Sequence, residues 1–212
     1  MIWNPELKIA FFHVTKTAGW SIMTLLKDYY GFEKDMYRHG GPKMGIQAVN
    51  DLQSYTTFAV VRNPFERLLS WYYHMIFTII DIINRGKKVR DDQQWLVNNC
   101  LTFKDFVYKA KGVYRDNNQV FMNFRQSQIN FLQFPNGDLP TYILRFEDLY
   151  FEWRKLCNKL EWEYHPLPRL NASRVKIHDY RSYYTPDMIK IVSDRYKEDL
   201  DYFGYTFNGK EN

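Results

Sequence analysis

The chain has 212 residues, of which 45% are hydrophobic and 25% charged, so it is long enough and apolar enough for one domain with a sizeable core, and global disorder is excluded. The formal net charge of +5 favours anionic ligands, but no dense block of Lys and Arg accompanies it, so no nucleic-acid partner is expected. The two cysteines, Cys100 and Cys157, have no paired spacing, which argues against a disulfide framework or a zinc site and predicts a reducing, cytoplasmic location.

The first predicted strand covers residues 8–14, KIAFFHV, and ends in a turn over residues 15–19. Its continuous apolar run is typical of a strand covered on both faces, and a helix is predicted from about Trp20. Such a corner directs backbone N–H groups and the positive end of the helix dipole to one point. Lys16 adds a full charge and Ser21 a hydroxyl, so the corner suits a phosphate or sulfate ester. An ordinary turn with an exposed lysine is the alternative.

A second predicted strand, residues 56–61, also ends in a cation, Arg62, and a helix opens at Asn63 and Pro64. An arginine at the carboxyl end of a strand lies where open α/β sheets bind ligands, and its planar fork suits a phosphate. Taken alone, Arg62 could simply pair with Glu66. Two cationic corners on one sheet edge favour a ligand with two phosphate groups.

The rest of the chain completes an α/β pattern. Residues 84–101 are polar and irregular, which predicts a surface excursion, and residues 102–132 are predicted to be helical. A third buried strand is predicted over 141–147. The last helix is predicted to begin with Thr185 as N-cap and to end at Gly204. Strands alternating with helices predict a central parallel sheet flanked by helices.

The sequence predicts no membrane anchor. The N-terminal stretch MIWNPELK lacks the charged start and apolar core of a secretory signal. No segment approaches the roughly 20 apolar residues of a membrane span. The most apolar segment, residues 75–83, is short and is interrupted by Asp81. The sequence does not indicate an oligomeric state.

Three segments carry a resemblance to a known family. Residues 16–22, KTAGWSI, resemble the PKTGGTSI signature of sulfotransferases that use PAPS (3'-phosphoadenosine 5'-phosphosulfate). Residues 61–70, VRNPFERLLS, are similar to the 3'-phosphate motif of the same enzymes, VRNPxxRLxSxY. The tail over residues 183–205 looks like the end of Golgi-type carbohydrate sulfotransferases and their bacterial relatives. Two motifs in the family's order, together with the tail, form a specific signal.

The resemblance implies a P-loop NTPase-like three-layer fold in a single sulfotransferase domain over residues 1–212. It implies PAPS as co-substrate and PAP (adenosine 3',5'-diphosphate) as the product that leaves, without a metal. It also implies a hydroxyl-bearing acceptor, for which a saccharide is the preferred candidate. The 5'-phosphosulfate is expected to contact the first corner, which consists of Lys16, Thr17, Ala18, Gly19, Trp20 and Ser21. Arg62 and Ser70 are expected to hold the 3'-phosphate. Ser173 and Arg174 are expected to contact the nucleotide from a loop before the last helix, with a plain basic loop as the alternative.

Transfer to a hydroxyl needs a base, and histidine titrates in the right range. His39, in the stretch MYRHGGP, is the preferred candidate, and Glu33 is the second. His13 is expected to pack inside the first strand and His74 to belong to its helix. The carboxylates of Glu147 and Asp148 resemble a family segment that is structural, with a capping role for the next helix, and no metal site is expected there.

The resemblance has three departures. Val14 and Thr15 replace the residue-Pro step of the family, and two further changes leave other functions open. Ala18 replaces a glycine and so tolerates fewer backbone conformations, and Trp20 replaces a threonine hydroxyl. A relative that binds nucleotide or glycan without turnover is therefore one alternative. A P-loop-like nucleotide kinase is another, although residues 12–21 do not match the GxxxxGK[ST] pattern that an ATP-binding loop needs.

Overall fold

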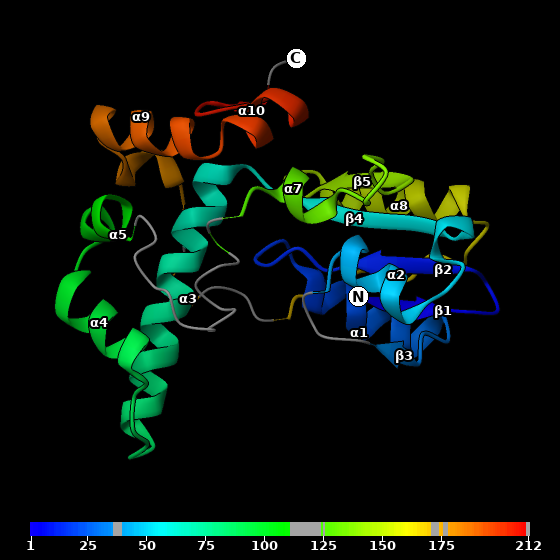
Figure 1. Cartoon of the computed structure of the whole chain (residues 1–212), viewed down its shortest axis with the longest axis horizontal. Helices are drawn as coiled ribbons and strands as arrows, with labels where there is room; N and C mark the ends of the chain where they lie inside the picture. The colour runs from blue at the N-terminus through cyan, green and yellow to red at the C-terminus, as the bar shows by residue number, and fades with distance from the viewer. Residues whose placement is uncertain (36–39, 111–123, 125, 171–173, 176–177, 211–212) are drawn as a thin grey trace. The chain divides into compact units, whose positions relative to one another are not determined.

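The protein divides into two compact units, seen in a computed structural model (Figure 1). The structure describes residues 1–35, 40–110, 124, 126–170, 174–175 and 178–210. Unit 1 combines Met1–Arg62 with Gln128–Ala172, and unit 2 combines Asn63–Ser127 with Ser173–Asn212. The single domain over residues 1–212 stays a prediction.

Unit 1 is built on a five-stranded mixed sheet with the strand order β3-β1-β2-β4-β5. Its strands are β1 (Ile2–Asn4), β2 (Ile9–Phe12), β3 (Lys34–Asp35), β4 (Thr56–Val61) and β5 (Tyr142–Arg145). The three predicted strands, β2, β4 and β5, run parallel, whereas β1 is antiparallel to both β2 and β3. The α/β fold with parallel central strands is therefore confirmed. The antiparallel edge adds two strands that were not predicted.

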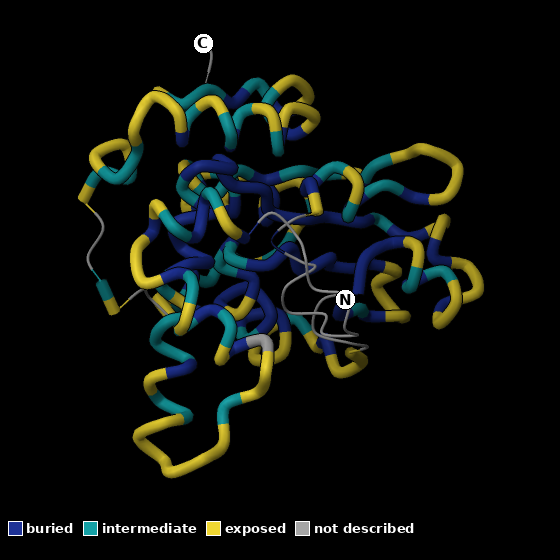
Figure 2. Tube along the Cα trace, turned by 60° about the vertical axis from the view of Figure 1, so that its left-hand side comes forward, coloured by how far each residue is buried: buried dark blue, intermediate teal, exposed yellow. Residues whose placement is uncertain are grey.

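The central strands of unit 1 are buried because helices flank the sheet. All residues of β2 are buried, and so are all but the first of β4 (Figure 2). The helices of this unit are α1 (Gly19–Tyr29), α2 (Pro42–Ala48), α7 (Gln128–Leu132), α8 (Leu149–Lys159) and a short 3-10 helix, Leu52–Ser54. One hydrophobic cluster joins α1 and α8 to alternate residues of the strands, with Phe11, Phe58 and Trp153 among its fully buried members.

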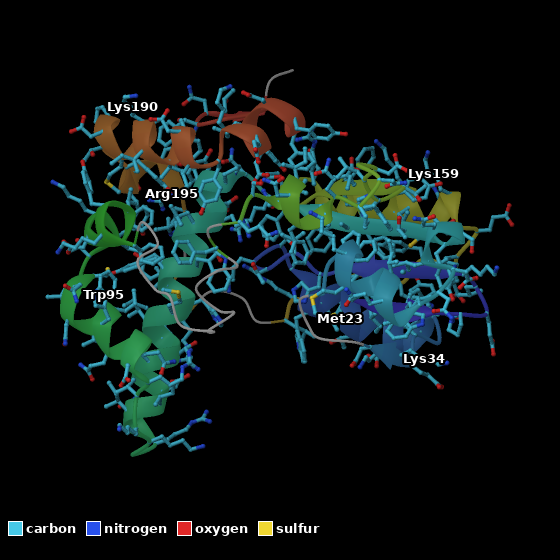
Figure 3. The ribbon with its side chains drawn as sticks, in the orientation of Figure 1. Met23, Lys34, Trp95, Lys159, Lys190 and Arg195 are labelled. Carbon is cyan, nitrogen blue, oxygen red and sulfur yellow. The ribbon has the colours of Figure 1, made fainter. Side chains whose placement is uncertain are left out.

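Unit 2 is helical around the long helix α3. Its elements are α3 (Pro64–Asn84), α4 (Asp91–Asn99), α5 (Phe103–Lys109), a 3-10 helix (Tyr180–Tyr183), α9 (Pro186–Arg195), α10 (Lys197–Phe203) and the hairpin β6 (Tyr205–Thr206) with β7 (Gly209–Lys210). Asn63 begins α3 as predicted, since its side-chain oxygen accepts from the N–H of Phe65 at 3.1 Å. Arg195 of α9, labelled in Figure 3, donates to the carbonyl of Val107 in α5 at 2.8 Å.

Two predictions about unit 2 were wrong. The last helix is two helices, because Tyr196 between them leaves the helical conformation. Its buried hydroxyl donates to the carbonyl of Phe124. Thr185 does cap its start and Gly204 does close its end. The segment 84–101 is not wholly irregular, since it contains α4. Its Leu96 and Cys100 are buried in the core of the unit, and that apolar pair was obscured by polar neighbours.

Other predictions fall partly outside the described residues. In the segment predicted to be helical, 102–132, the structure has α5 and α7, while residues 111–123 and 125 lie outside the described part. Asp148 occupies the N-cap position of α8, but its side chain makes no capping hydrogen bond, so the proposed capping by that carboxylate is corrected. No helix in the described part is long and apolar enough to cross a bilayer.

Candidate active site

The first corner lies in unit 1 between β2 and α1 and has a distinctive backbone. Thr17 is fully buried, and its hydroxyl donates to the carbonyl of Val14 at 2.8 Å, which closes the turn. Lys16 and Ala18 both have left-handed backbone angles, with φ of 67° and 62°. Left-handed residues within a turn gather N–H groups into a concavity that binds anions. Ala18 thus has a backbone conformation that glycine, the residue of the family motif at this position, adopts without steric cost.

Gly19 is required by space rather than by its backbone angles. A Cβ built on Gly19 would lie 1.8 Å from Cδ2 of His13, well inside van der Waals contact. The ring of His13 is itself buried and stacks with Phe11 at 6.2 Å between centroids. His13 therefore packs in the core, as predicted, and it presses directly on the first residue of α1.

The beginning of α1 places two further predicted residues. Ser21 is only 5% exposed, and its hydroxyl oxygen accepts from the N–H of Leu170 at 3.2 Å. A hydroxyl that accepts one hydrogen bond can still donate another. Trp20 is 37% exposed. Together with Lys16, these residues surround a helix N-terminus, where the dipole and the backbone N–H groups favour an anion.

The second corner meets the first within unit 1. Because β2 and β4 are parallel neighbours, Lys16 and Arg62 follow strands that end at the same sheet edge. Nη1 of Arg62 donates to the backbone carbonyl of Lys16 at 3.1 Å, and the guanidinium lies over the ring of Phe146 at 3.9 Å. Burial, followed by the charge of Arg62, lowers the pKa of Lys16 to about 8. Two cations thus lie side by side, and the geometry fits an anion with more than one charged group.

Sequence reasoning missed two residues that contact Arg62. Gln128, at the start of α7, is fully buried, and its amide makes two hydrogen bonds to the backbone of Arg62, at 2.9 and 2.8 Å. Phe146 supplies the ring beneath the guanidinium. Phe146 follows the strand predicted over 141–147, so a contact at the sheet edge could have been inferred. Gln128 has no motif around it, and nothing in the sequence distinguishes it from other glutamines.

The other predicted ligand contacts lie in unit 2 or outside the described part. Ser70, in the second turn of α3, is 9% exposed. Arg174 makes a two-pronged ion pair with Asp81 at 2.9 and 2.6 Å, and its guanidinium lies 5.5 Å from the ring centroid of Phe77. Ser173 lies outside the described residues. The assignments of Ser70, Ser173 and Arg174 to the nucleotide stay predictions.

Neither candidate base is tested by the structure. His39 lies outside the described residues, and Glu33 is exposed next to β3. The glycine that follows His39 by two positions has a structural reason, because a Cβ on Gly41 would lie 2.5 Å from the carbonyl oxygen of Phe131. In the described part of the chain, no three His, Cys, Asp or Glu side chains gather as metal ligands would.

Comparison with known proteins adds the family. A family model described as the sulfotransferase family matches residues 1–206, which include both corners and nearly the whole chain. Neither curated proteins nor solved structures give a match. The matched region contains the turn with its two left-handed residues, Lys16 and Arg62 at one sheet edge, and the α/β sheet that brings them together. The chain therefore belongs to the sulfotransferase family and is a PAPS-dependent transferase.

Proposed function

We propose that this protein transfers the sulfuryl group of PAPS to a hydroxyl of a saccharide. The observation that carries the proposal is the pair of cations in unit 1, Lys16 and Arg62, joined by a hydrogen bond of 3.1 Å from the Arg62 guanidinium to the Lys16 carbonyl. Each cation alone would fit many anions. Two at the carboxyl ends of parallel strands, beside a helix N-terminus, suit a nucleotide with phosphate groups on both sides of its ribose.

Each residue has a role in this proposal. The backbone of residues 16–21 holds the 5'-phosphosulfate, and Lys16 neutralises the charge that develops on the departing phosphate. Arg62 and Ser70 hold the 3'-phosphate, with Ser173 and Arg174 near the nucleotide. His39 takes the proton from the acceptor hydroxyl as its oxygen bonds to sulfur, and the bond from sulfur to the 5'-phosphate oxygen breaks, which releases PAP. Glu33 is the second candidate for the base.

The saccharide acceptor rests on two features of the sequence. The tail over residues 183–205 is similar to that of carbohydrate sulfotransferases, and aromatic residues make up 18% of the chain. Aromatic rings pack well against the apolar faces of sugars. The acceptor is tested with labelled PAPS and a panel of neutral sugars, acidic sugars, phenols and lipid alcohols. Transfer to sugars supports the proposal, and transfer confined to phenols or lipids contradicts it.

Nucleotide choice is tested by thermal shift. PAP is expected to raise the melting temperature of the wild-type protein, because a ligand that binds only the folded state stabilises it. Arg62→Ala is expected to lose most of that shift, whereas Lys190→Ala, in an exposed pair with Asp194, is expected to keep it. A shift with Mg-ATP and none with PAP would contradict the proposal and favour a kinase.

A catalytically impaired binding protein is the second candidate. It is favoured by Ala18 and Trp20, which replace a glycine and a threonine of the family motif. The left-handed conformation of Ala18 argues against it, because the backbone of the turn is formed without the glycine. Tight binding of PAP with no transfer to any member of the acceptor panel would favour this second function.

A further inference from the structure

We infer that Gln128 is a positioning residue for Arg62 and thereby for recognition of the nucleotide's 3'-phosphate; this rests on the proposed function. The inference begins with the way β4 ends. Its last residue, Val61, pairs with Arg145 of β5, and its carbonyl accepts from the N–H of Phe146 at 2.8 Å. Arg62 comes one residue beyond the strand, where the backbone is no longer held by the ladder of β4 and β5.

Beyond the end of β4, the side-chain amide of Gln128 holds the backbone. Its Oε1 accepts from the N–H of Arg62 at 2.9 Å, and its Nε2 donates to the carbonyl of Arg62 at 2.8 Å. An amide that bonds both backbone groups of one residue imitates a neighbouring strand. Gln128 therefore extends the order of β4 by one residue, and that residue is the arginine.

Burial makes the two hydrogen bonds between Gln128 and Arg62 hard to replace. Gln128 has no exposed surface, and Arg62 is 9% exposed, so water does not easily replace either hydrogen bond, and a buried polar group left unpaired is costly. With its backbone held by Gln128, the guanidinium lies over Phe146 at 3.9 Å and reaches the carbonyl of Lys16 at 3.1 Å. The amide thus fixes the backbone position from which the guanidinium of Arg62 extends.

The carboxamide of Gln128 satisfies both bonds without any change of protonation. Methionine has nearly the same shape but offers neither a donor nor a strong acceptor. Ionised glutamate accepts from the N–H of Arg62 but cannot donate to its carbonyl, whereas protonated glutamate can do both. Gln128→Met and Gln128→Glu therefore separate the hydrogen bonds from the volume of the side chain. Gln133→Met is the matched control, because Gln133 follows α7 and its amide donates to the carbonyl of Gly137 at 3.2 Å.

The test compares dissociation constants for PAP and for adenosine 5'-monophosphate, which lacks the 3'-phosphate, measured by calorimetry on the full chain. The wild type is expected to prefer PAP strongly. Gln128→Met is expected to reduce that preference roughly tenfold, the effect of about one hydrogen bond, while its affinity for adenosine 5'-monophosphate changes little. Gln133→Met is expected to keep the wild-type preference. Adding Gln128→Met to Arg62→Ala is expected to change the preference no further.

A purely structural role would give other results. If the role of Gln128 were purely structural, Gln128→Met would lower the melting temperature or weaken the binding of both nucleotides equally. In either case the preference for PAP would stay unchanged, and an unchanged preference overturns the inference. Gln128→Glu covers the case in which Gln128→Met does not fold. Its ionised carboxylate cannot donate to the carbonyl of Arg62, so its preference for PAP is expected to fall below that of the wild type, and an unchanged preference overturns the inference as well. A wild type without preference for PAP overturns the proposed role of Arg62 itself, which is a separate result.

Discussion

At the scale of single residues, Lys16 combines its proposed role in phosphate binding with a cost in stability. Its ammonium group is largely buried next to the guanidinium of Arg62, which is why its pKa falls from 10.5 to about 8. Residues that concentrate charge in a binding site commonly destabilise the free protein. Phosphate groups of a bound ligand would place negative charge next to these two cations.

Lys16→Met is expected to abolish sulfuryl transfer and yet to stabilise the free protein by about 1–2 kcal/mol, because it removes a buried charge beside another cation. Transfer is measured with labelled PAPS, and stability by urea unfolding. Lys190→Met, at an exposed ion pair with Asp194, serves as control and is expected to change neither quantity. Full transfer activity of Lys16→Met would contradict the proposed mechanism, whatever the stability of the variant.

The affinity for PAP is expected to fall as the pH rises through about 8. In the free protein Lys16 loses its proton there, whereas bound phosphate groups favour the charged form, so binding above pH 8 takes up a proton. For stability the sign is opposite: between about 8 and 10.5 the unfolded chain binds more protons, so the free protein gains stability with pH. Calorimetry at pH 7 and 9, in buffers of different ionisation enthalpy, measures the uptake. No uptake, or the same uptake in Lys16→Met, contradicts the assignment.

Ala18 provides a third test at this scale. Its φ of 62° costs an L-residue roughly 1 kcal/mol, which glycine avoids at the expense of a more flexible unfolded chain. Ala18→Gly is therefore expected to raise stability slightly, by less than about 1 kcal/mol, and to keep the affinity for PAP. Ala18→Val is expected to lower both, since a branched side chain tolerates this conformation poorly. A destabilised Ala18→Gly would show that the turn does not hold this conformation in solution.

At the scale of elements, the approach of α1 to β2 decides the shape of the first corner. Gly19 begins α1, His13 follows β2, and no room for a Cβ exists between them. Gly19→Ala is expected to destabilise the protein by about 1–3 kcal/mol and to weaken PAP binding, because the helix start must shift. The double variant Gly19→Ala with His13→Ala is expected to recover part of the PAP affinity. No recovery would indicate that the glycine is needed for another reason.

The sequence predicted elements well where the signal was local. Strands β2 and β4 are runs of apolar and β-branched residues, and α3 opens with an Asn-Pro cap, so short-range chemistry was sufficient. The sequence did not predict elements whose ends or pairing depend on residues far away in the chain. Tyr196 leaves the helical conformation between α9 and α10, and its hydroxyl donates to Phe124, a partner more than seventy positions away. Strand β1 pairs with β2 and β3, and its own composition does not predict a strand.

At the scale of the whole molecule, the net charge of +5 favours the approach of anionic ligands. The affinity for PAP is expected to fall by roughly tenfold or more when the salt concentration rises from about 50 to 500 mM, since screening shortens the range of the field. Adenosine 5'-monophosphate, with fewer charges, is expected to respond less. Equal responses of the two nucleotides would show that the charged groups of PAP are not bound by cations.

The sequence by itself determined the family, the α/β fold and the two cationic corners, because buried strands, helix caps and turn residues are encoded in neighbouring positions. Only the tertiary structure decided what those corners become. It brought Arg62 to the carbonyl of Lys16, placed Gln128 on the backbone of Arg62, and lowered the pKa of Lys16. These effects depend on burial and on contacts between residues far apart in the chain, and no local pattern of residues records them.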